Sequence, residues 1–119
     1  MTKANKFIIF GKNIISQKEI LEVSKTLKSG WIGTGKKVIK FEQNFARYKN
    51  TSYSKAVNSC TAALFLSLKA LNLKFSDEVI IPALSFVSTA NVVLHAGAKP
   101  RFVDVDLNTR NIDLNKIEN

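Results

Sequence analysis

The segment from Asn58 to Ala63 is the part of this sequence best suited to binding an anion. It is rich in small and hydroxyl-bearing residues and precedes an apolar stretch of helical length. The first N–H groups of a helix lack backbone partners and carry partial positive charge, which favours phosphate binding. Ser59 and Thr61 add hydroxyls, while Cys60 and Ala62 are small enough for a phosphate to approach. A simple helix cap by Ser59 is the competing interpretation, and this stretch alone favours it.

The aromatic residue Phe86 is a second candidate, because it follows the apolar run Val79–Pro82. That run predicts a strand, and α/β proteins bind ligands beyond the carboxyl ends of their strands. An aromatic ring at this place can stack on a flat cofactor. A position in the core is the alternative, since isolated Phe residues are usually buried.

The segment from Gly30 to Lys37 comes within one residue of the phosphate-binding loop GxxxxGK[ST]. Lys37 stands where a Ser or Thr would bind magnesium, and the segment follows a helix where that loop follows a strand. It also fails as a dinucleotide fingerprint, because the third glycine would fall on Val38. It is therefore either a flexible connection or a loop whose glycines let the backbone approach a ligand closely.

The ionisable side chains give weaker signals. Asp104 and Asp106 could bind a metal or act as acid and base, but capping of a loop is the commoner use of such residues. His95 lies near the end of an apolar helical segment, where packing or helix-end capping is expected. Cys60 is the only cysteine, so an internal disulfide or a cysteine-based metal cluster is excluded. No catalytic residue and no metal ligand is assigned within the chain.

The loop from Gly30 to Lys37 is expected to lie between two helices. Ser16 and Glu19 have the spacing of a capping box, which predicts a helix to about Lys28 that Gly30 ends. A second amphipathic helix is expected over 38–48, with its apolar side lying on a core.

From residue 54 onward, strands and helices are expected to alternate. A continuous β-branched run is typical of a strand covered on both faces, and a helix without a polar face should be buried. The expected elements are a strand over 55–59, a buried helix over 61–71, a strand over 79–82, a helix over 87–95 ended by Gly97, a strand over 99–106 and the start of a helix over 114–117. This alternation predicts an α/β fold with a mainly parallel sheet and no domain boundary within 1–119.

Composition limits the partners and the compartment. The chain has 119 residues, 45 % of them hydrophobic, and a net charge of +9. Its lysines are scattered, so neither nucleic acid nor a membrane surface is the expected partner. Residues 79–98 carry no charge, but polar residues interrupt them and they fit a strand, a loop and a helix better than a membrane span. One cysteine and no secretory segment predict a reducing, cytoplasmic location.

Four motifs together resemble the DegT/DnrJ/EryC1/StrS family of sugar aminotransferases. They are SGWIGTGKKVIKFEQNFA from Ser29, AVNSCTAALFLSLKAL from Ala56, DEVIIPALSFVSTANVVLHAGAKPRFVDVD from Asp77 and NIDLNKIE from Asn111. Each motif alone is weakly specific, but four in this order and spacing are specific. The likeness runs from about Ser16 to Asn119.

The resemblance implies the aspartate-aminotransferase-like fold of pyridoxal-phosphate-dependent transferases. In that fold a three-layer α/β large domain and a smaller C-terminal domain form a homodimer with shared active sites, and this chain would be the N-terminal part of the large domain. The implied activity is amino transfer from a donor such as glutamate to a nucleotide-linked keto sugar, in the synthesis of polysaccharides or amino sugars. The implied cofactor is pyridoxal 5′-phosphate.

Carried over by position, the resemblance implies that Thr61 and Ala62 hold the cofactor phosphate and that Phe86 stacks on the pyridine ring. Cys60 lies beside them where Gly is commoner. The resemblance thus favours a phosphate site over a simple cap by Ser59. The loop before the second helix resembles the family's segment near the substrate and the dimer interface, which makes substrate-binding candidates of Trp31, Gly33, Thr34 and Gly35.

By the same resemblance, the family's Asp that pairs with the pyridine nitrogen and its Schiff-base Lys lie beyond Asn119. Family members with His in place of that Lys dehydrate or deoxygenate the sugar, and nothing before Asn119 separates the two activities. A truncated product without catalysis is a third interpretation. We expect these 119 residues alone to be inactive. We also expect them to leave apolar surface and a strand edge uncovered, and so to aggregate.

Overall fold

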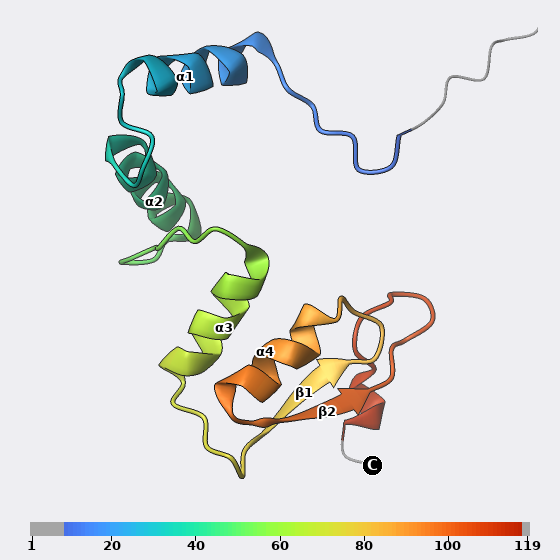
Figure 1. Ribbon diagram of the computed structural model, residues 1–119. Coiled ribbons are helices and arrows are strands. Elements are labelled where there is room, and N and C mark those ends of the chain that lie inside the picture. The colour runs from blue at the N-terminus through green and yellow to red at the C-terminus, as the bar shows by residue number, and fades with distance from the viewer. Residues whose placement is uncertain (1–8, 118–119) are drawn as a thin grey trace, which may run out of the picture. The chain divides into compact units, whose positions relative to one another are not determined.

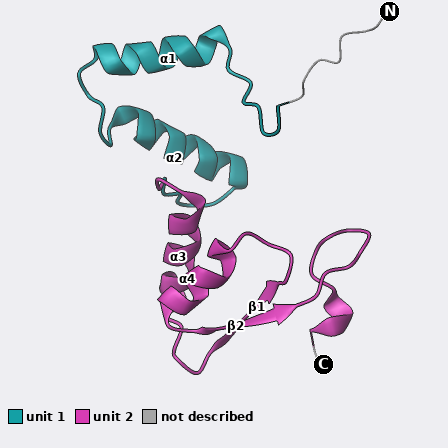
Figure 2. Ribbon diagram, turned by 45° about the vertical axis from the view of Figure 1, so that its right-hand side comes forward, with its two compact units in different colours: residues 1–56 teal, residues 57–119 magenta. Residues whose placement is uncertain are grey.

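The computed structural model describes residues 9–117, and the chain divides into two compact units, Met1–Ala56 and Val57–Asn119 (Figure 1 and Figure 2). Within the described residues, the first unit contains two helices. The second contains two helices, a two-stranded sheet and a short 3-10 helix. The absence of a domain boundary within 1–119 stays a prediction.

Helix α1 (Gln17–Lys28) begins at the predicted capping box. The Ser16 N–H donates to Glu19 Oε2 at 2.6 Å, and Ser16 Oγ accepts from the Lys18 N–H at 3.2 Å. Hydrogen bonding with Ser16 lowers the pKa of the Glu19 carboxyl from its ordinary value. Gly30 follows the helix with a φ of 72°, a left-handed conformation that glycine adopts without steric cost. The prediction of this helix is confirmed.

Helix α2 (Lys36–Lys49) begins two residues before the predicted start. It is followed by the C-cap residue Asn50, whose backbone has a left-handed conformation. The rings of Phe41 and Phe45 lie 6.1 Å apart on it. Ala46 is its one buried residue, while Phe41 and Phe45 are 58 % and 46 % exposed. The sequence predicted a core beneath this helix, but the described part of the first unit does not supply one.

The predicted strand over 55–59 is wrong. These residues are irregular, and no strand in the described part of the chain pairs with them. A strand needs a hydrogen-bonded neighbour, so a suitable composition alone does not form one. Instead, the Ala56 N–H donates to Glu42 Oε1 at 3.0 Å, and Lys55 Nζ donates to Glu42 Oε2 at 3.1 Å. One carboxylate of α2 thus holds this segment.

The second unit is built on two parallel strands, β1 (Glu78–Pro82) and β2 (Lys99–Val103), paired so that Glu78 lies opposite Lys99. Helix α4 (Ser88–Ala96) connects them. Parallel strands joined through a helix confirm the predicted α/β fold.

The ends of these elements differ in part from the prediction. Gly97, with a φ of 92°, ends α4 as expected. Strand β2 stops at Val103, because the chain then turns and Val105 forms an antiparallel bridge with Ile112. The expected helix near the end of the described chain is a single 3-10 turn, η1 (Leu114–Lys116).

The core of the second unit lies between α4 and one face of the sheet. Helix α4 contacts both strands, and α3 (Cys60–Ala70) lies beside α4 (Figure 1). The buried cluster at the centre of this core comes from β1, α4 and the turn after it, and consists of Ile81, Val93 and Ala98. Around them pack the partly buried residues Leu68, Leu73, Val79 and Ala90.

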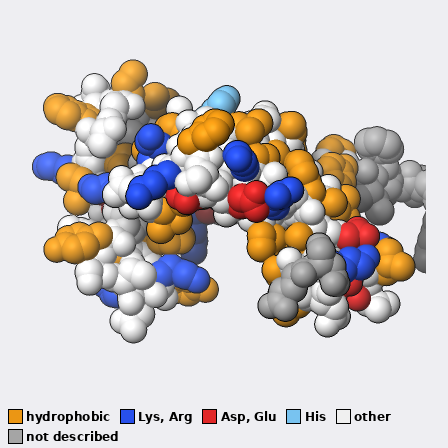
Figure 3. All heavy atoms as spheres, turned by 90° about the horizontal axis from the view of Figure 1, so that it is seen from below, with side chains coloured by type: hydrophobic (Ala, Val, Ile, Leu, Met, Phe, Trp, Pro, Cys, Tyr) orange, Lys and Arg blue, Asp and Glu red, His pale blue; other side chains and the backbone are white. Residues whose placement is uncertain are grey.

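The prediction of a fully buried helix over 61–71 is wrong for the described part of the chain. No residue of α3 is buried, and Leu66 is 53 % exposed. Strand β1 is also covered on one face only, since Ile81 is 4 % exposed and the neighbouring Ile80 is 44 % exposed. Figure 3 shows hydrophobic side chains spread over the visible face. An apolar sequence pattern predicts that a surface favours burial, but it does not identify the segment that covers this surface.

Candidate functional site

The start of α3 is the centre of the candidate site. Ser59 Oγ accepts from the Ala62 N–H at 3.1 Å, and the Ser59 carbonyl accepts from the Ala63 N–H at 3.1 Å. Ser59 therefore caps the helix, as the simpler interpretation of this segment predicted. Because the cap takes the Ala62 N–H, a phosphate would have to replace the Ser59 hydroxyl to reach that donor.

Other donors at this turn have no partner in the described part of the chain. Among residues 9–117, neither the N–H groups of Cys60 and Thr61 nor the Thr61 hydroxyl makes a hydrogen bond. Both residues are exposed. Unpaired N–H groups at a helix start attract anions, because the helix dipole places partial positive charge there. The residues present therefore fit a phosphate group. The small side chain of Ala62 leaves room for it beside these donors.

Phe86 lies in the loop after β1 and is 76 % exposed, so the alternative of a core position does not hold in the described part. Its loop is fixed at both ends. The Ala83 N–H donates to the Val103 carbonyl at 2.8 Å, and the Thr89 N–H donates to the Phe86 carbonyl at 2.9 Å. The Ser85 and Thr89 hydroxyls lie 2.8 Å apart. No sequence motif predicted this hydroxyl pair. The signal that could have found it is the spacing of four residues at a helix start, which places two side chains next to each other.

The two candidate cofactor elements lie on the same side of the second unit. In Figure 1 and Figure 2 α3 and α4 lie side by side with their amino ends toward the top of the view, and the loop from β1 to α4 lies beyond the carboxyl end of β1. The carboxyl end of a strand is where α/β folds bind their ligands. The structure therefore turns the start of α3 and the Phe86 loop to the same end of the pair of helices.

In the first unit, the loop between α1 and α2 folds back on itself. Trp31 Nε1–H donates to the Thr34 carbonyl at 3.0 Å. The indole lies so close to Gly35 that an added Cβ would be 2.6 Å from Trp31 Cδ1. The glycine is thus required by this close approach and not by its backbone, which is extended. Gly33 has open space around it.

A cavity of about 630 Å³ lies beside this loop. Small-molecule sites in proteins have volumes of roughly 300–1,000 Å³, so the cavity is of suitable size for a ligand. All four predicted substrate residues line it, together with three lysines that had not been predicted, Lys25, Lys36 and Lys37.

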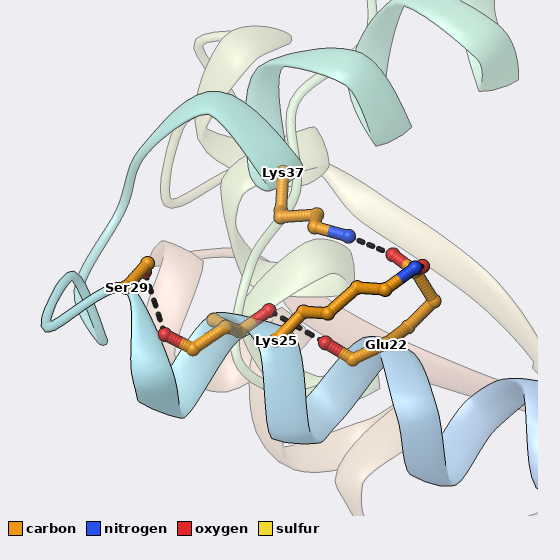
Figure 4. A network of polar contacts seen from close by, with 5 residues as sticks. Glu22, Lys25, Ser29 and Lys37 are labelled. Atoms are coloured by element: carbon orange, nitrogen blue, oxygen red, sulfur yellow. Dashed lines mark hydrogen bonds and ion pairs between the residues drawn. The ribbon is translucent and has the colours of Figure 1, made fainter.

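A shared carboxylate orders two of these lysines (Figure 4). Glu22 accepts from Lys25 Nζ at 3.0 Å and also forms an ion pair with Lys37, which joins α1 to the first turn of α2. Ser29 Oγ donates to the Thr26 carbonyl at 2.6 Å and closes the end of α1. The Glu22–Lys37 pair could not be predicted, because no local spacing links residues so far apart in the sequence.

Of the two aspartates after β2, Asp106 caps a loop, as the commoner interpretation predicted, whereas Asp104 forms an ion pair. Asp106 Oδ1 accepts from the Asn108 and Thr109 N–H groups at 3.0 and 2.7 Å, and the bond from Thr109 lowers the pKa of Asp106. Asp104 pairs with Lys116 Nζ at 2.9 Å, which lowers the pKa of Asp104. His95 is exposed in the last turn of α4.

Residues 9–117 contain no cluster of three or more His, Cys, Asp or Glu side chains that could hold a metal ion. No helix in this range is both long and apolar enough to cross a membrane.

The family profile of the DegT/DnrJ/EryC1/StrS aminotransferases matches residues 13–119. The chain belongs to this family. The match covers both units, including the start of α3, the Phe86 loop and the Trp31 loop.

Relatives of this family member are sugar-processing enzymes. The chain is 50 % identical over 116 residues to the spore coat polysaccharide biosynthesis protein SpsC of Bacillus subtilis, which covers 98 % of this chain and 30 % of SpsC. Its fold matches Spr1654 of Streptococcus pneumoniae, a protein assigned as a sugar aminotransferase and solved in its PLP form. The TM-score is 0.85 at 40 % identity, over 93 % of this chain and 28 % of Spr1654. It also matches the Escherichia coli GDP-4-keto-6-deoxy-D-mannose-3-dehydratase with bound hydrated PLP, with a TM-score of 0.82 at 31 % identity, over 87 % of this chain and 28 % of the dehydratase.

These matches confirm the predicted fold class and family. The chain has the α/β fold of PLP-dependent sugar enzymes, and it spans under a third of the length of the relatives it matches. PLP is the cofactor in the solved structures of the family named above.

Proposed function

We propose that this chain supplies the cofactor-phosphate site of a PLP-dependent aminotransferase that acts on a nucleotide-linked keto sugar. The observation that supports the proposal most strongly is the start of α3. There a member of this aminotransferase family presents the N–H groups of Cys60 and Thr61 and the Thr61 hydroxyl without hydrogen-bond partners among residues 9–117.

In this proposal, the residues of the second unit bind and orient the cofactor. The backbone donors at Cys60 and Thr61 and the Thr61 hydroxyl bind its phosphate, and the small side chain of Ala62 leaves room for it. The exposed ring of Phe86 stacks on the pyridine ring and fixes its plane. When bound, the cofactor supplies an electron sink for the substrate carbon.

The residues of the first unit bind the substrate in the same proposal. Trp31 offers an aromatic surface, while Gly33, Thr34 and Gly35 bring backbone close to the cavity. Lysines on the cavity wall suit the negative charge of a nucleotide diphosphate. We further propose glutamate as the amino donor, a cytoplasmic homodimer as the working enzyme and polysaccharide or amino-sugar synthesis as its role. The relation to SpsC supports the last of these.

Titration with pyridoxamine 5′-phosphate tests the cofactor site. This probe has no aldehyde and therefore forms no imine with surface lysines. Calorimetry of the full-length enzyme should show binding, and Thr61→Val should weaken it at least about ten-fold, because a hydrogen bond to a charged group contributes about 1.5–3 kcal/mol. Thr109→Val is the matched control, since the Thr109 hydroxyl accepts from the Asn111 N–H in a distant loop. Equal affinities of Thr61→Val and the unmodified chain would contradict the phosphate site.

The 119 residues alone are proposed to have no transaminase turnover, because they span under a third of the length of their relatives. The purified chain with PLP and glutamate should release no 2-oxoglutarate above the level of PLP in buffer. Release that depends on the chain would overturn this part of the proposal.

The match to a sugar dehydratase supports a second candidate, removal of a hydroxyl from the sugar. The two activities give different products from one nucleotide-linked keto sugar and glutamate. Transamination adds nitrogen to the sugar, whereas dehydration removes oxygen. Mass spectrometry of the product formed by the full-length enzyme decides between them.

A further inference from the structure

The loop that carries Phe86 is closed by a bond between two hydroxyls. Ser85 Oγ and Thr89 Oγ1 lie 2.8 Å apart, on either side of the exposed aromatic residue. The Thr89 N–H also donates to the Phe86 carbonyl at 2.9 Å. The Phe86 main chain is therefore enclosed in a small ring of contacts that begins at Ser85 and ends at Thr89.

This hydroxyl pair is not a helix cap. A capping side chain accepts from a backbone N–H in the first turn of its helix. The N-cap of α4 is Val87, which has no side-chain cap, and the Ser85 and Thr89 hydroxyls bind each other. The contact therefore closes the loop around Phe86 and leaves the first turn of α4 uncapped.

The rest of the surroundings would leave the ring poorly fixed. Phe86 is 76 % exposed and its neighbour Val87 is 65 % exposed, so little apolar packing holds either side chain. The loop is tied to the sheet at Ala83, three residues earlier. Between that tie and α4, the hydroxyl pair is the side-chain hydrogen bond that closes the loop around Phe86 within the described residues.

We infer that Ser85 and Thr89 are positioning residues that hold the Phe86 ring in the orientation needed to stack on the cofactor. The inference rests on the proposed role of Phe86 and adds two residues to that site. A ring held in place before the ligand arrives loses less conformational freedom on binding, so the pair should raise affinity without touching the cofactor.

Pyridoxamine 5′-phosphate binding to the full-length enzyme tests the inference by calorimetry. Phe86→Ala should weaken binding about ten-fold, since loss of an aromatic stack removes its packing and about 0.5–1.5 kcal/mol beyond it. Ser85→Ala and Thr89→Val should each weaken binding about three- to five-fold, the size of one neutral hydrogen bond. Thr89→Ser keeps the hydroxyl and should restore affinity. Ser67→Ala, which removes a hydroxyl bonded to the Ala63 carbonyl in α3, is the matched control and should bind as the unmodified chain.

A double-mutant cycle separates positioning from general stability. If Ser85 acts through the ring, Ser85→Ala should have no further effect on affinity in the Phe86→Ala background. A merely structural role would weaken binding equally in both backgrounds. Circular dichroism of each variant checks that α3 and α4 remain folded.

The outcomes distinguish this inference from the proposed function. If Phe86→Ala weakens binding and the hydroxyl variants do not, the positioning role is overturned and the cofactor site stands. If Thr61→Val weakens binding and Phe86→Ala does not, the stacking role fails and the positioning role fails with it. A full-length enzyme that binds no pyridoxamine 5′-phosphate at all would overturn both.

Discussion

Different forces stabilise each of the two units of the chain. The second unit has a buried apolar cluster in which Val93 is 1 % exposed. In the described part of the first unit Ala46 is the buried residue, and two carboxylates, Glu22 and Glu42, link segments distant in sequence. Burial of apolar surface is the stronger of these forces, since exposed ion pairs contribute little. The second unit should therefore be the more resistant to unfolding.

The same contrast separates the two parts of the proposed site. The proposed phosphate residues begin a helix that packs against α4, while the proposed substrate residues stand in a loop closed by one indole hydrogen bond. A site on packed elements keeps its geometry better than one on a loop. Substrate recognition should thus be the more adaptable half of the function.

The largest expected effect comes from the core of the second unit. Val93→Ala should lower the free energy of unfolding by about 2 kcal/mol, because it removes buried methyl groups and leaves a cavity. Val87→Ala makes the same chemical change at a side chain that is 65 % exposed, and should cost at most about 0.5 kcal/mol. Urea unfolding followed by far-UV circular dichroism measures both. Equal costs would contradict the assignment of the core.

The next effect concerns the carboxylate that holds residues 55–56. The Ala56 N–H and Lys55 lower the pKa of Glu42 from its ordinary value of 4.5. A carboxyl whose folded-state pKa is lowered stabilises the fold above its ordinary pKa and loses this contribution as the pH falls through the lowered value. Glu42→Gln should therefore lower the melting temperature at neutral pH, and the difference from the unmodified chain should shrink below pH 4.5. A difference that is independent of pH would show that this pair is not responsible.

A smaller and more local effect is expected at the Trp31 loop. Gly35→Ala should displace the indole and break its bond to Thr34, because the new methyl group would overlap the ring. Trp31 is the only tryptophan and is already 66 % exposed, so loss of its bond to Thr34 should change the intensity of its emission and its quenching by acrylamide. Gly33→Ala meets no atom within 4 Å and should leave the emission unchanged.

The smallest effect is expected at the exposed ion pair between the strands. Glu78 accepts from Arg101 Nε at 2.9 Å, but the two side chains are 44 % and 65 % exposed. Solvent screens such a pair, so Glu78→Gln should leave the urea midpoint within experimental error. Its comparison with Glu42→Gln is informative, since the Glu42 side chain is only 14 % exposed. A large effect at Glu78 would contradict the ranking of the two carboxylates.

Local signals in the sequence predicted most of the elements. The capping box at Ser16 and the glycines at 30 and 97 marked helix ends correctly, because these signals depend on a few neighbouring residues. The strand over 55–59 and the burial of α3 were wrong for the opposite reason. Both depend on partners that lie elsewhere. The described chain supplies no partner strand for 55–59, and it packs α4 against α3 without burying any residue of that helix.

The candidate site divides in the same way. Small and hydroxyl-bearing residues near Thr61 pointed to the start of a helix, and the structure places them there with unpaired donors. No sequence pattern predicted the Glu22–Lys37 ion pair. The four-residue spacing of Ser85 and Thr89 was a signal for their contact, but one of low specificity. Long-range pairs and side-chain directions follow from tertiary structure, which motif spacing does not describe.

Each strand of the parallel pair has one neighbour in the described chain. Each therefore keeps an outer row of amide and carbonyl groups that can accept a further strand. Because the row on β1 and the row on β2 lie on opposite borders of the ribbon, growth can proceed in both directions. A pair of this kind can become the middle of a wider sheet when more strands are available, and it can template pairing between separate molecules when they are not.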